Sequence, residues 1–301
     1  MKVLAYSLFI SLSLLSLLSH AQLPPCRGSI ISKNISINDF DSLDIQGPVN
    51  VYIDATQTHT SLQILGDPKR VLAVTYSEKN HSLHLGTKPV YRSLPRERLT
   101  IRVNTSPAQI KQIQFDSDAS LFGKGLTGSL SLRTHGAGQI NLYTNKLNLK
   151  SLYTNGNESI IFHNILSSNL KIESYNSHNI VIQGVVSLSK VNCTGNGNLM
   201  VYWVNSPYLR INAKGKEKIS LAGVVKTLDI QLSQDSQLYA QQLRTQQGFI
   251  KTEKRAQATV NVRNTLSAFA KDHSVIYYLT PLNFISKYSE GKGLVLNNNR
   301  S

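Results

Sequence analysis

The sequence predicts an all-β fold, a parallel β-solenoid whose rungs are 19 or 20 residues long. The first observation is a repeat between about residues 113 and 277, in which an apolar residue recurs at steps of 19 or 20. The second is that further apolar residues usually follow each start by eight and ten positions, as Ile140 and Leu142 do. The third is that no helical period accompanies these units. Such a unit cannot bury its own apolar side chains, whereas stacked copies bury a continuous core. The nine starting positions are Ile113, Leu132, Leu152, Ile172, Val191, Ile211, Ile230, Ile250 and Phe269.

The position two residues after each start is small or apolar in eight copies, Phe115 to Thr252, and we expect it to face the core. Cys193 occupies this position, so the sequence predicts a buried free thiol, which behaves as a small core residue. The only other cysteine is Cys26. A disulfide between Cys26 and Cys193 is the alternative that an oxidising compartment would permit.

Residues 1–21 have the three parts of a signal peptide. Lys2 is the positive region, residues 3–18 form a run rich in Leu and Ser, and Ser19, His20 and Ala21 end on the small residue that signal peptidase needs. The run is short for a membrane span of about 20 residues. We therefore expect cleavage after Ala21 and an exported protein with no transmembrane segment after cleavage.

The remaining chain divides into three parts. Residues 22–38 are predicted to be an irregular leader, because Pro24, Pro25 and Gly28 discourage regular structure. Residues 39–112 alternate apolar and polar side chains, the period of half-buried strands, and form an N-terminal β module. We expect this module to begin and cap the solenoid, because a bare end rung exposes unpaired edges. Residues 113–301 are then the solenoid repeats and a C-terminal cap.

The charge is strongly basic. Lys and Arg number 32 against 17 Asp and Glu, a formal net charge of +15, or +14 without the signal segment. This excess favours anionic partners such as an anionic glycan or lipid. Nucleic acid is disfavoured because the chain is exported and its lysines are not interleaved with aromatic side chains, as stacking platforms require.

The order of short motifs in the N-terminal module resembles a known family. Residues 40–47 (FDSLDIQG), 49–53 (VNVYI), 64–67 (ILGD) and 83–85 (LHL) are similar to the opening of the family called "putative autotransporter adhesin, head GIN domain", found in bacterial envelope proteins. The turns at 135–140, 155–160 and 195–199 resemble its repeated Gly-Ser-Gly-x-Ile element. Residues 274–277, Pro281 and 290–293 resemble its closing segment.

The resemblance covers roughly residues 38–296. Leu279 stands where the family usually has glycine, and after Ile211 the turns become rich in Lys and Gln. The resemblance implies a right-handed β-helix and an extracytoplasmic bacterial location, whether periplasm, outer surface or secreted.

Cleavage of a polysaccharide needs two carboxylates close together, and the sequence does not predict such a pair. Glu158 and Glu217 share a column but lie three rungs apart, about 14 Å at 4.8 Å per rung, beyond the spacing of about 5–9.5 Å used in glycoside hydrolysis. Glu217 and Asp235 lie on adjacent rungs, but Lys216 and Lys218 flank Glu217, which predicts an exposed ion-pair cluster. We expect no catalytic residues, cofactor or metal site; a polysaccharide lyase or hydrolase is the alternative.

One strand of each repeat predicts an exposed apolar face. Ile161, Val181 and Met200 point outward at the same position of three successive rungs. Contiguous apolar surface marks an interaction site, so we expect contact with a protein partner or a second copy. The alternative is that the C-terminal tail or a loop covers this face. The predicted face comprises Tyr143, Ile161, His163, Val181, Met200, Tyr202 and Trp203.

Two turns carry clustered cations. Lys214, Lys216 and Lys218 lie in one turn, and Lys251, Lys254 and Arg255 lie in the turn two repeats later. They are candidate contacts for an anionic glycan or lipid headgroup, and a solvated, solubilising surface is the alternative. The sequence thus predicts an exported, non-catalytic, adhesin-like binding module of the cell envelope or surface. A purely structural envelope protein is the other alternative.

Overall fold

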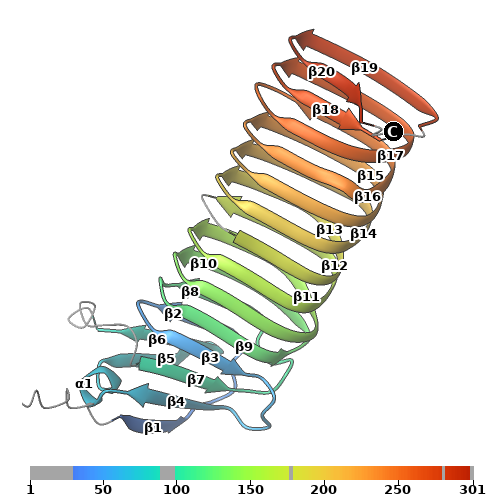
Figure 1. Cartoon of the computed structure of the whole chain (residues 1–301). Coiled ribbons are helices and arrows are strands. Elements are labelled where there is room, and N and C mark those ends of the chain that lie inside the picture. The colour runs from blue at the N-terminus through green and yellow to red at the C-terminus, as the bar shows by residue number, and fades with distance from the viewer. Residues whose placement is uncertain (1–29, 89–98, 176–178, 280–281, 299–301) are drawn as a thin grey trace, which may run out of the picture.

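The computed structural model describes residues 30–88, 99–175, 179–279 and 282–298. These residues form one long coil of stacked parallel strands with a short antiparallel region at the N-terminal end (Figure 1). The signal segment, residues 22–29 of the leader, Cys26 and Pro281 lie outside the described residues.

The N-terminal region contains short strands and one helical turn. They are β1 (Ile31–Ser36), β2 (Ser42–Gln46), β3 (Asn50–Asp54), β4 (Ser61–Gly66), α1 (Pro68–Val71), β5 (Val74–Lys79), β6 (Ser82–Thr87), β7 (Leu99–Asn104), β8 (Gln112–Asp116), β9 (Ser120–Leu126) and β10 (Ser129–Gly136).

The long strands that follow each run around most of one rung. They are β11 (Gln139–Gly156), β12 (Ser159–Tyr175), β13 (Asn179–Gly195), β14 (Asn198–Gly215), β15 (Lys218–Gln234), β16 (Gln237–Thr252) and β17 (Gln257–Asp272). The C-terminal strands are β18 (Val275–Tyr278), β19 (Phe284–Gly291) and β20 (Leu294–Asn297).

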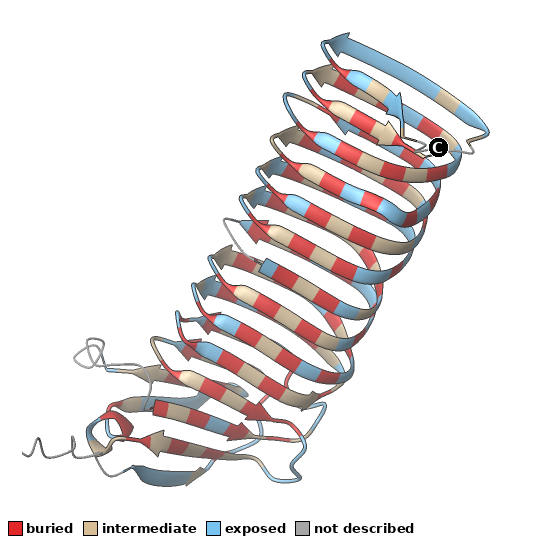
Figure 2. Ribbon diagram, in the orientation of Figure 1, coloured by how far each residue is buried: buried red, intermediate tan, exposed pale blue. Residues whose placement is uncertain are grey.

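Each long strand bends twice, so that a rung has three sides. In β12 the alternation of buried and exposed side chains breaks at His163–Asn164 and again at Ser168–Asn169. Between these bends lies a short side, which in β12 is residues 165–167, with Ile165 and Ser167 buried and Leu166 exposed. Because side chains alternate along a strand, each bend resets which residues face inward. Figure 2 shows buried residues alternating with intermediate or exposed ones along the stacked rungs, whereas the outermost strand, β19, is almost entirely exposed.

The repeat positions stack in register, which confirms the predicted solenoid. Leu132 pairs with both Ile113 and Leu152, and the column continues through Ile172 and Val191 to Ile250. The predicted inward position two residues later is also buried, with Cys193 only 2% exposed. The ninth predicted start, Phe269, is wrong by one residue. Ile250 pairs with Ala268, which is buried, whereas Phe269 is half-buried on the outer surface.

Phe269 lies outside because its ring has partners there. It packs against Tyr288 of the C-terminal strand β19, with ring centroids 5.0 Å apart, and Lys251 lies over it at 5.7 Å. The step from the eighth start to the ninth is therefore 18 residues rather than 19. A bulky apolar residue next to a small one misleads a pattern search when the small one fills the core.

The first rungs are not stacked in chain order. The strands β2 and β3 pair in parallel with β8 and β9 on one side and with β6 and β7 on the other. The chain thus forms one rung with β2 and β3. It then adds β6 and β7 on one side of that rung, and it continues the solenoid with β8 and β9 on the other side. At the N-terminal end of the stack the strands pair in antiparallel fashion. The strand β4 pairs with β7, β5 pairs with β6, and β1 pairs with β4. This reversal of direction caps the parallel stack, as expected for a solenoid.

The opposite end is closed by the C-terminal strands. The strands β18 and β19 both pair in parallel with β17, and β20 pairs with β18 (Figure 1). The outer strand β19 is largely exposed. The described C-terminal residues therefore lie at the end of the stack, not over its sides.

Candidate binding grooves along the turns

A backbone hydrogen-bond ladder continues from rung to rung through the turns. The amide of Lys216 donates to the carbonyl of Gly195 at 2.7 Å, and the amide of Arg255 donates to that of Gln234 at 2.9 Å. The residues before these amides have positive φ, 102° at Gly215 and 63° at Lys254. Side chains on successive turns are thereby held about one strand spacing, 4.8 Å, apart.

A groove of about 1040 Å³ runs along the outer edge of these turns, and we call it the edge groove. It is lined by the cations Lys216, Lys254, Arg255 and Lys292, by His273, and by the carboxylates Asp235 and Asp272. Arg255 donates to Asp235 at 2.6 and 2.8 Å, and this hydrogen bonding lowers the pKa of the Asp235 carboxyl. Asp272 accepts from the backbone amide of Lys254 at 3.1 Å. Both carboxylates are thus occupied, and the groove keeps a positive balance.

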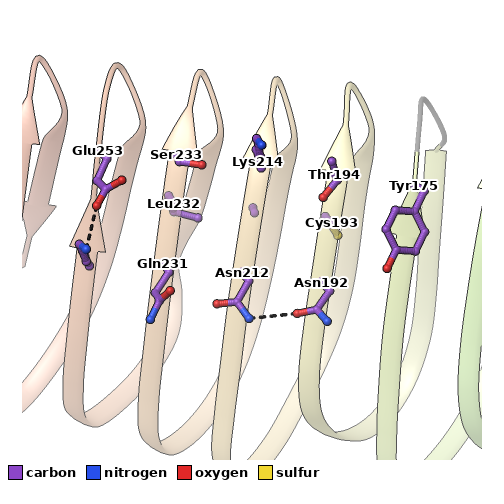
Figure 3. Close-up of a pocket in the computed structure, with 12 residues that line it drawn as sticks. Tyr175, Asn192, Cys193, Thr194, Asn212, Lys214, Gln231, Leu232, Ser233 and Glu253 are labelled. Carbon is purple, nitrogen blue, oxygen red and sulfur yellow. Dashed lines mark hydrogen bonds and ion pairs between the residues drawn. The ribbon is translucent and has the colours of Figure 1, made fainter.

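A second groove of about 380 Å³ lies beside it on one flat side of the coil, and we call it the face groove. Figure 3 shows Asn192, Asn212 and Gln231 next to one another on three successive rungs. Asn212 donates to the side chain of Asn192 at 3.0 Å, which fixes both amides. Tyr175, 37% exposed, lies at one end of the row. The groove is therefore a row of amides and hydroxyls with an aromatic ring at one end.

The cations of the face groove are Lys214 and Lys251. Lys251 forms an ion pair with Glu253 at 2.7 Å, and Lys214 is exposed between Thr194 and Ser233. The lining is thus neutral to weakly basic.

The structure divides the six predicted anion contacts between two surfaces and leaves one apart. Lys214 and Lys251 lie in the face groove, whereas Lys216, Lys254 and Arg255 lie in the edge groove. Lys218 lines neither, because it begins the strand after the turn and is paired with Asn198 and Gln237. These residues are close in sequence, but the turn directs their side chains to different surfaces.

The neutral members of the grooves were missed by sequence reasoning, which searched for charge. Asn192, Asn212 and Gln231 each stand one residue after a repeat start, in line with Lys251. An alignment of the repeats by position would have revealed this polar column. His273 and Lys292 fall in the last two turns, where the repeat pattern no longer separates turn from strand.

The predicted apolar face forms one column in the structure. Ile161 pairs with Val181, which pairs with Met200, and all three are half-buried. Tyr143 is 46% exposed and stacks on His163 with ring centroids 4.1 Å apart, and His163 is hydrogen-bonded to Gln183 at 2.8 Å. Tyr202 and Trp203 are exposed beyond the column.

Glu217 contradicts the predicted exposed ion-pair cluster. Its side chain is 1% exposed, as is that of Glu158, because the residue occupies the inward position of its turn. Lys216 and Lys218 point outward on either side. Burial, with a further contribution from the Glu217 charge, raises the pKa of the Cys193 thiol. Asp235 instead faces the edge groove, so the two carboxylates do not form one surface site.

In the ranges that the structure describes, no group of three or more His, Cys, Asp or Glu is arranged to hold a metal ion. Within the same ranges, none of the helices has the length and hydropathy that crossing a bilayer requires.

The fold is a β-solenoid with two grooves along its turns. The chain belongs to the family described as "putative auto-transporter adhesin, head GIN domain", whose model matches residues 39–199 and 144–280. No curated protein matches the chain.

Several solved structures are similar over most of the chain. A "putative lipid binding protein" from Parabacteroides distasonis is 14% identical with a TM-score of 0.47, covering 90% of this chain and 97% of its own. A "putative adhesin" from Parabacteroides merdae is 16% identical with the same TM-score and coverage. A "putative adhesin" from Parabacteroides distasonis is 14% identical, with a TM-score of 0.45, and covers 90% of this chain and 98% of its own.

Proposed function

We propose that the chain is an exported, non-catalytic, adhesin-like module that binds an anionic glycan along its turns. The observation that carries this proposal is the in-register stacking of the two grooves. The face groove offers amides and a tyrosine ring, which suit sugar hydroxyls and ring faces, and the edge groove offers cations for carboxylate or sulfate groups. Membership of an adhesin family supports a binding role.

An extended polymer fits this arrangement better than a small ligand does. Both grooves cross several rungs, and the rungs repeat at about 4.8 Å. On the rim, Lys216 and Arg255 are two rungs apart, as are Arg255 and Lys292. A linear glycan lying parallel to the solenoid axis would meet a cation at about every second rung.

A polysaccharide-cleaving enzyme is the less favoured function. Glu158 and Glu217 are buried, and Asp235 is held by Arg255. These carboxylates are therefore not placed as a pair facing one substrate bond. A purely structural envelope role predicts no selective ligand, so the same binding experiment separates it from the proposal.

The test is binding of the purified protein to an array of anionic and neutral glycans at low and at physiological salt. We expect selective binding to an anionic glycan that persists at physiological salt, because amide and aromatic contacts are little screened. Lys216→Glu should weaken this binding strongly.

The matched control is Lys218→Glu, which makes the same charge change two residues away but outside both grooves. Binding should be nearly unchanged in this variant. Equal losses in the two variants, or binding to every anion that disappears with salt, would mean that the net charge acts generically and that the grooves are not the site.

A further inference from the structure

The short side of the rungs carries an apolar ridge that is separate from both grooves. Large apolar side chains are exposed on this side, or for Trp203 at the bend that precedes it, on four successive rungs, β12 to β15. Leu166 is 49% exposed, Val185 45%, Trp203 71% and Val224 42%. We call these four residues the apolar ridge. Sequence analysis found only Trp203, because the bends, and not the repeat itself, decide that the other three face outward.

The pairing of the strands places the four residues close together on neighbouring rungs, with Asn205 and the bend at Trp203 between Val185 and Val224. Leu166 pairs with Val185. Val186, the next residue, pairs with Val204 after a register shift that begins at Gln183, and Trp203 lies at the bend directly before Val204. On the next pair of rungs Val224 lies beside Asn205, and it pairs on its other side with Arg244.

Trp203 displays its ring to solvent at a bend with left-handed backbone. Trp203 has φ of +70°, a left-handed conformation that is unusual for a bulky residue. Asn164, at the same bend two rungs away, adopts it with φ of +60° and hydrogen-bonds to the carbonyl of Thr144. The Trp203 indole has no hydrogen bond or ring partner among the residues that the structure describes. Lys146, at the corresponding bend of β11, also adopts it with φ of +54°, so the left-handed backbone belongs to the bend, and what is particular to Trp203 is a large ring that is 71% exposed there.

The charges around the ridge are all positive. Along the seven long strands, the bend and short side span residues 143–148, 163–168, 183–188, 202–207, 222–227, 241–246 and 261–266, and these contain no Asp or Glu. They contain four exposed cations, Lys146, Lys226, Arg244 and Arg263. None of the four forms an ion pair within the described part of the chain.

We propose that this side of the solenoid docks onto the surface of an anionic phospholipid bilayer. Tryptophan and tyrosine favour the membrane interface, where Trp203 would enter the headgroup region with Leu166, Val185 and Val224. The flanking cations are attracted by anionic headgroups. The ridge spans only three rung spacings, about 14 Å, which is narrow for a stable protein interface. Docking through this side leaves both grooves free.

The protein supplies its own probe, because Trp203 is its only tryptophan. The experiment is to titrate the purified protein with vesicles of phosphatidylcholine alone and of equimolar phosphatidylcholine and phosphatidylglycerol, and to record tryptophan emission and co-sedimentation. We expect a blue shift of the emission and co-sedimentation with the anionic vesicles only, and quenching by brominated acyl chains. Lys226→Ala should weaken the binding by about fivefold.

The decisive variant is Val185→Glu, which places a carboxylate in the ridge and keeps the tryptophan. We expect at least tenfold weaker vesicle binding. The matched control is Phe249→Glu, since Phe249 is equally exposed at 49% but lies on another side of the rung. It should bind as the unmodified protein does.

Three results would overturn the proposal: an emission spectrum unchanged by anionic vesicles, equal loss of binding in Val185→Glu and Phe249→Glu, or an emission shift that depends on protein concentration without lipid. The last would assign the ridge to self-association instead. Glycan binding by the same variants should be unaffected, so failure here is distinguishable from failure of the groove proposal.

Discussion

The two halves of the solenoid stack their rungs in the same way but differ in the residues of the core and of the turns. In the N-terminal half the interior contains large rings, Phe115 and Phe162, and the turns contain glycine. In the C-terminal half the interior contains alanines, such as Ala240 and Ala268, and the turns contain longer side chains. Because each rung contacts only its neighbours, the halves can differ without disturbing one another. The half with the smaller interior side chains is the one that carries most of the charged edge groove.

The turns show why the difference is possible. A Cβ added to Gly215 would lie 2.1 Å from the carbonyl oxygen of Gly195, so only glycine fits. One rung later Gln234 occupies the same place with φ of +65°. There the left-handed backbone is kept by a residue with a side chain, which lines the edge groove. The later turns thus have a less favourable backbone conformation, but they place side chains in the groove.

The largest expected effect is in the core of the N-terminal half. Phe162→Ala should lower the free energy of unfolding by about 3–5 kcal/mol, because a buried ring is replaced by a cavity. Val260→Ala, in the same interior column of the C-terminal half, should cost about 1–2 kcal/mol, because fewer buried methyl groups are lost. Denaturant melts of both variants measure the difference. Equal costs would show that core size does not distinguish the halves.

The next largest effect separates the two kinds of turn. Gly215→Ala should destabilise the protein by about 3 kcal/mol, near the upper end of the cost of local backbone strain. Gln234→Gly should be neutral or stabilising by about 1 kcal/mol, because it relieves a left-handed conformation. The two variants change adjacent rungs in opposite directions, and thermal melts under one condition compare them directly. A loss of stability in both would mean that the Gln234 side chain also supports the fold.

The smallest effect concerns the charged rim. Arg255→Ala should raise the pKa of Asp235 towards the ordinary carboxyl value of about 4, since the hydrogen bonds from Arg255 lower it. A carboxyl with a lowered pKa stabilises the folded state above its ordinary pKa and loses this contribution as pH falls through the lowered value. The pair is exposed to solvent, so the change in stability should be small. An NMR titration of the Asp235 carboxyl measures the shift, and an unchanged midpoint would show that Arg255 does not hold this carboxylate in solution.

Sequence reasoning identified the repeat, its register and the buried column because each depends on spacing along the chain. Ile113 to Ile250 stack as predicted, and Cys193 is buried as predicted. The error at Phe269 has a local cause, since Ala268 fills the core while the larger neighbour packs outside against Tyr288. Apolar character alone cannot tell a core position from an outer ring contact.

The candidate binding surfaces were only partly predictable. The cations were visible, but the turn directs Lys216 to the edge groove, Lys214 to the face groove and Lys218 to neither. The buried position of Glu217 was predicted wrongly, because its lysine neighbours suggested an exposed turn. Side chains adjacent in sequence point in different directions where the backbone reverses. The number of charged residues in a segment therefore shows which turn is charged, but not which surface of that turn carries the charge.

The sequence by itself determined the fold class, the rung length and which residues form the interior of each straight segment, because a period of two fixes the facing of side chains along a strand. The tertiary structure alone decided where the strands bend, that the first rungs stack out of chain order, and which outward residues meet in one groove or ridge. Those outcomes depend on contacts between neighbouring rungs, in which residues about 20 positions apart are paired, and no local pattern records them.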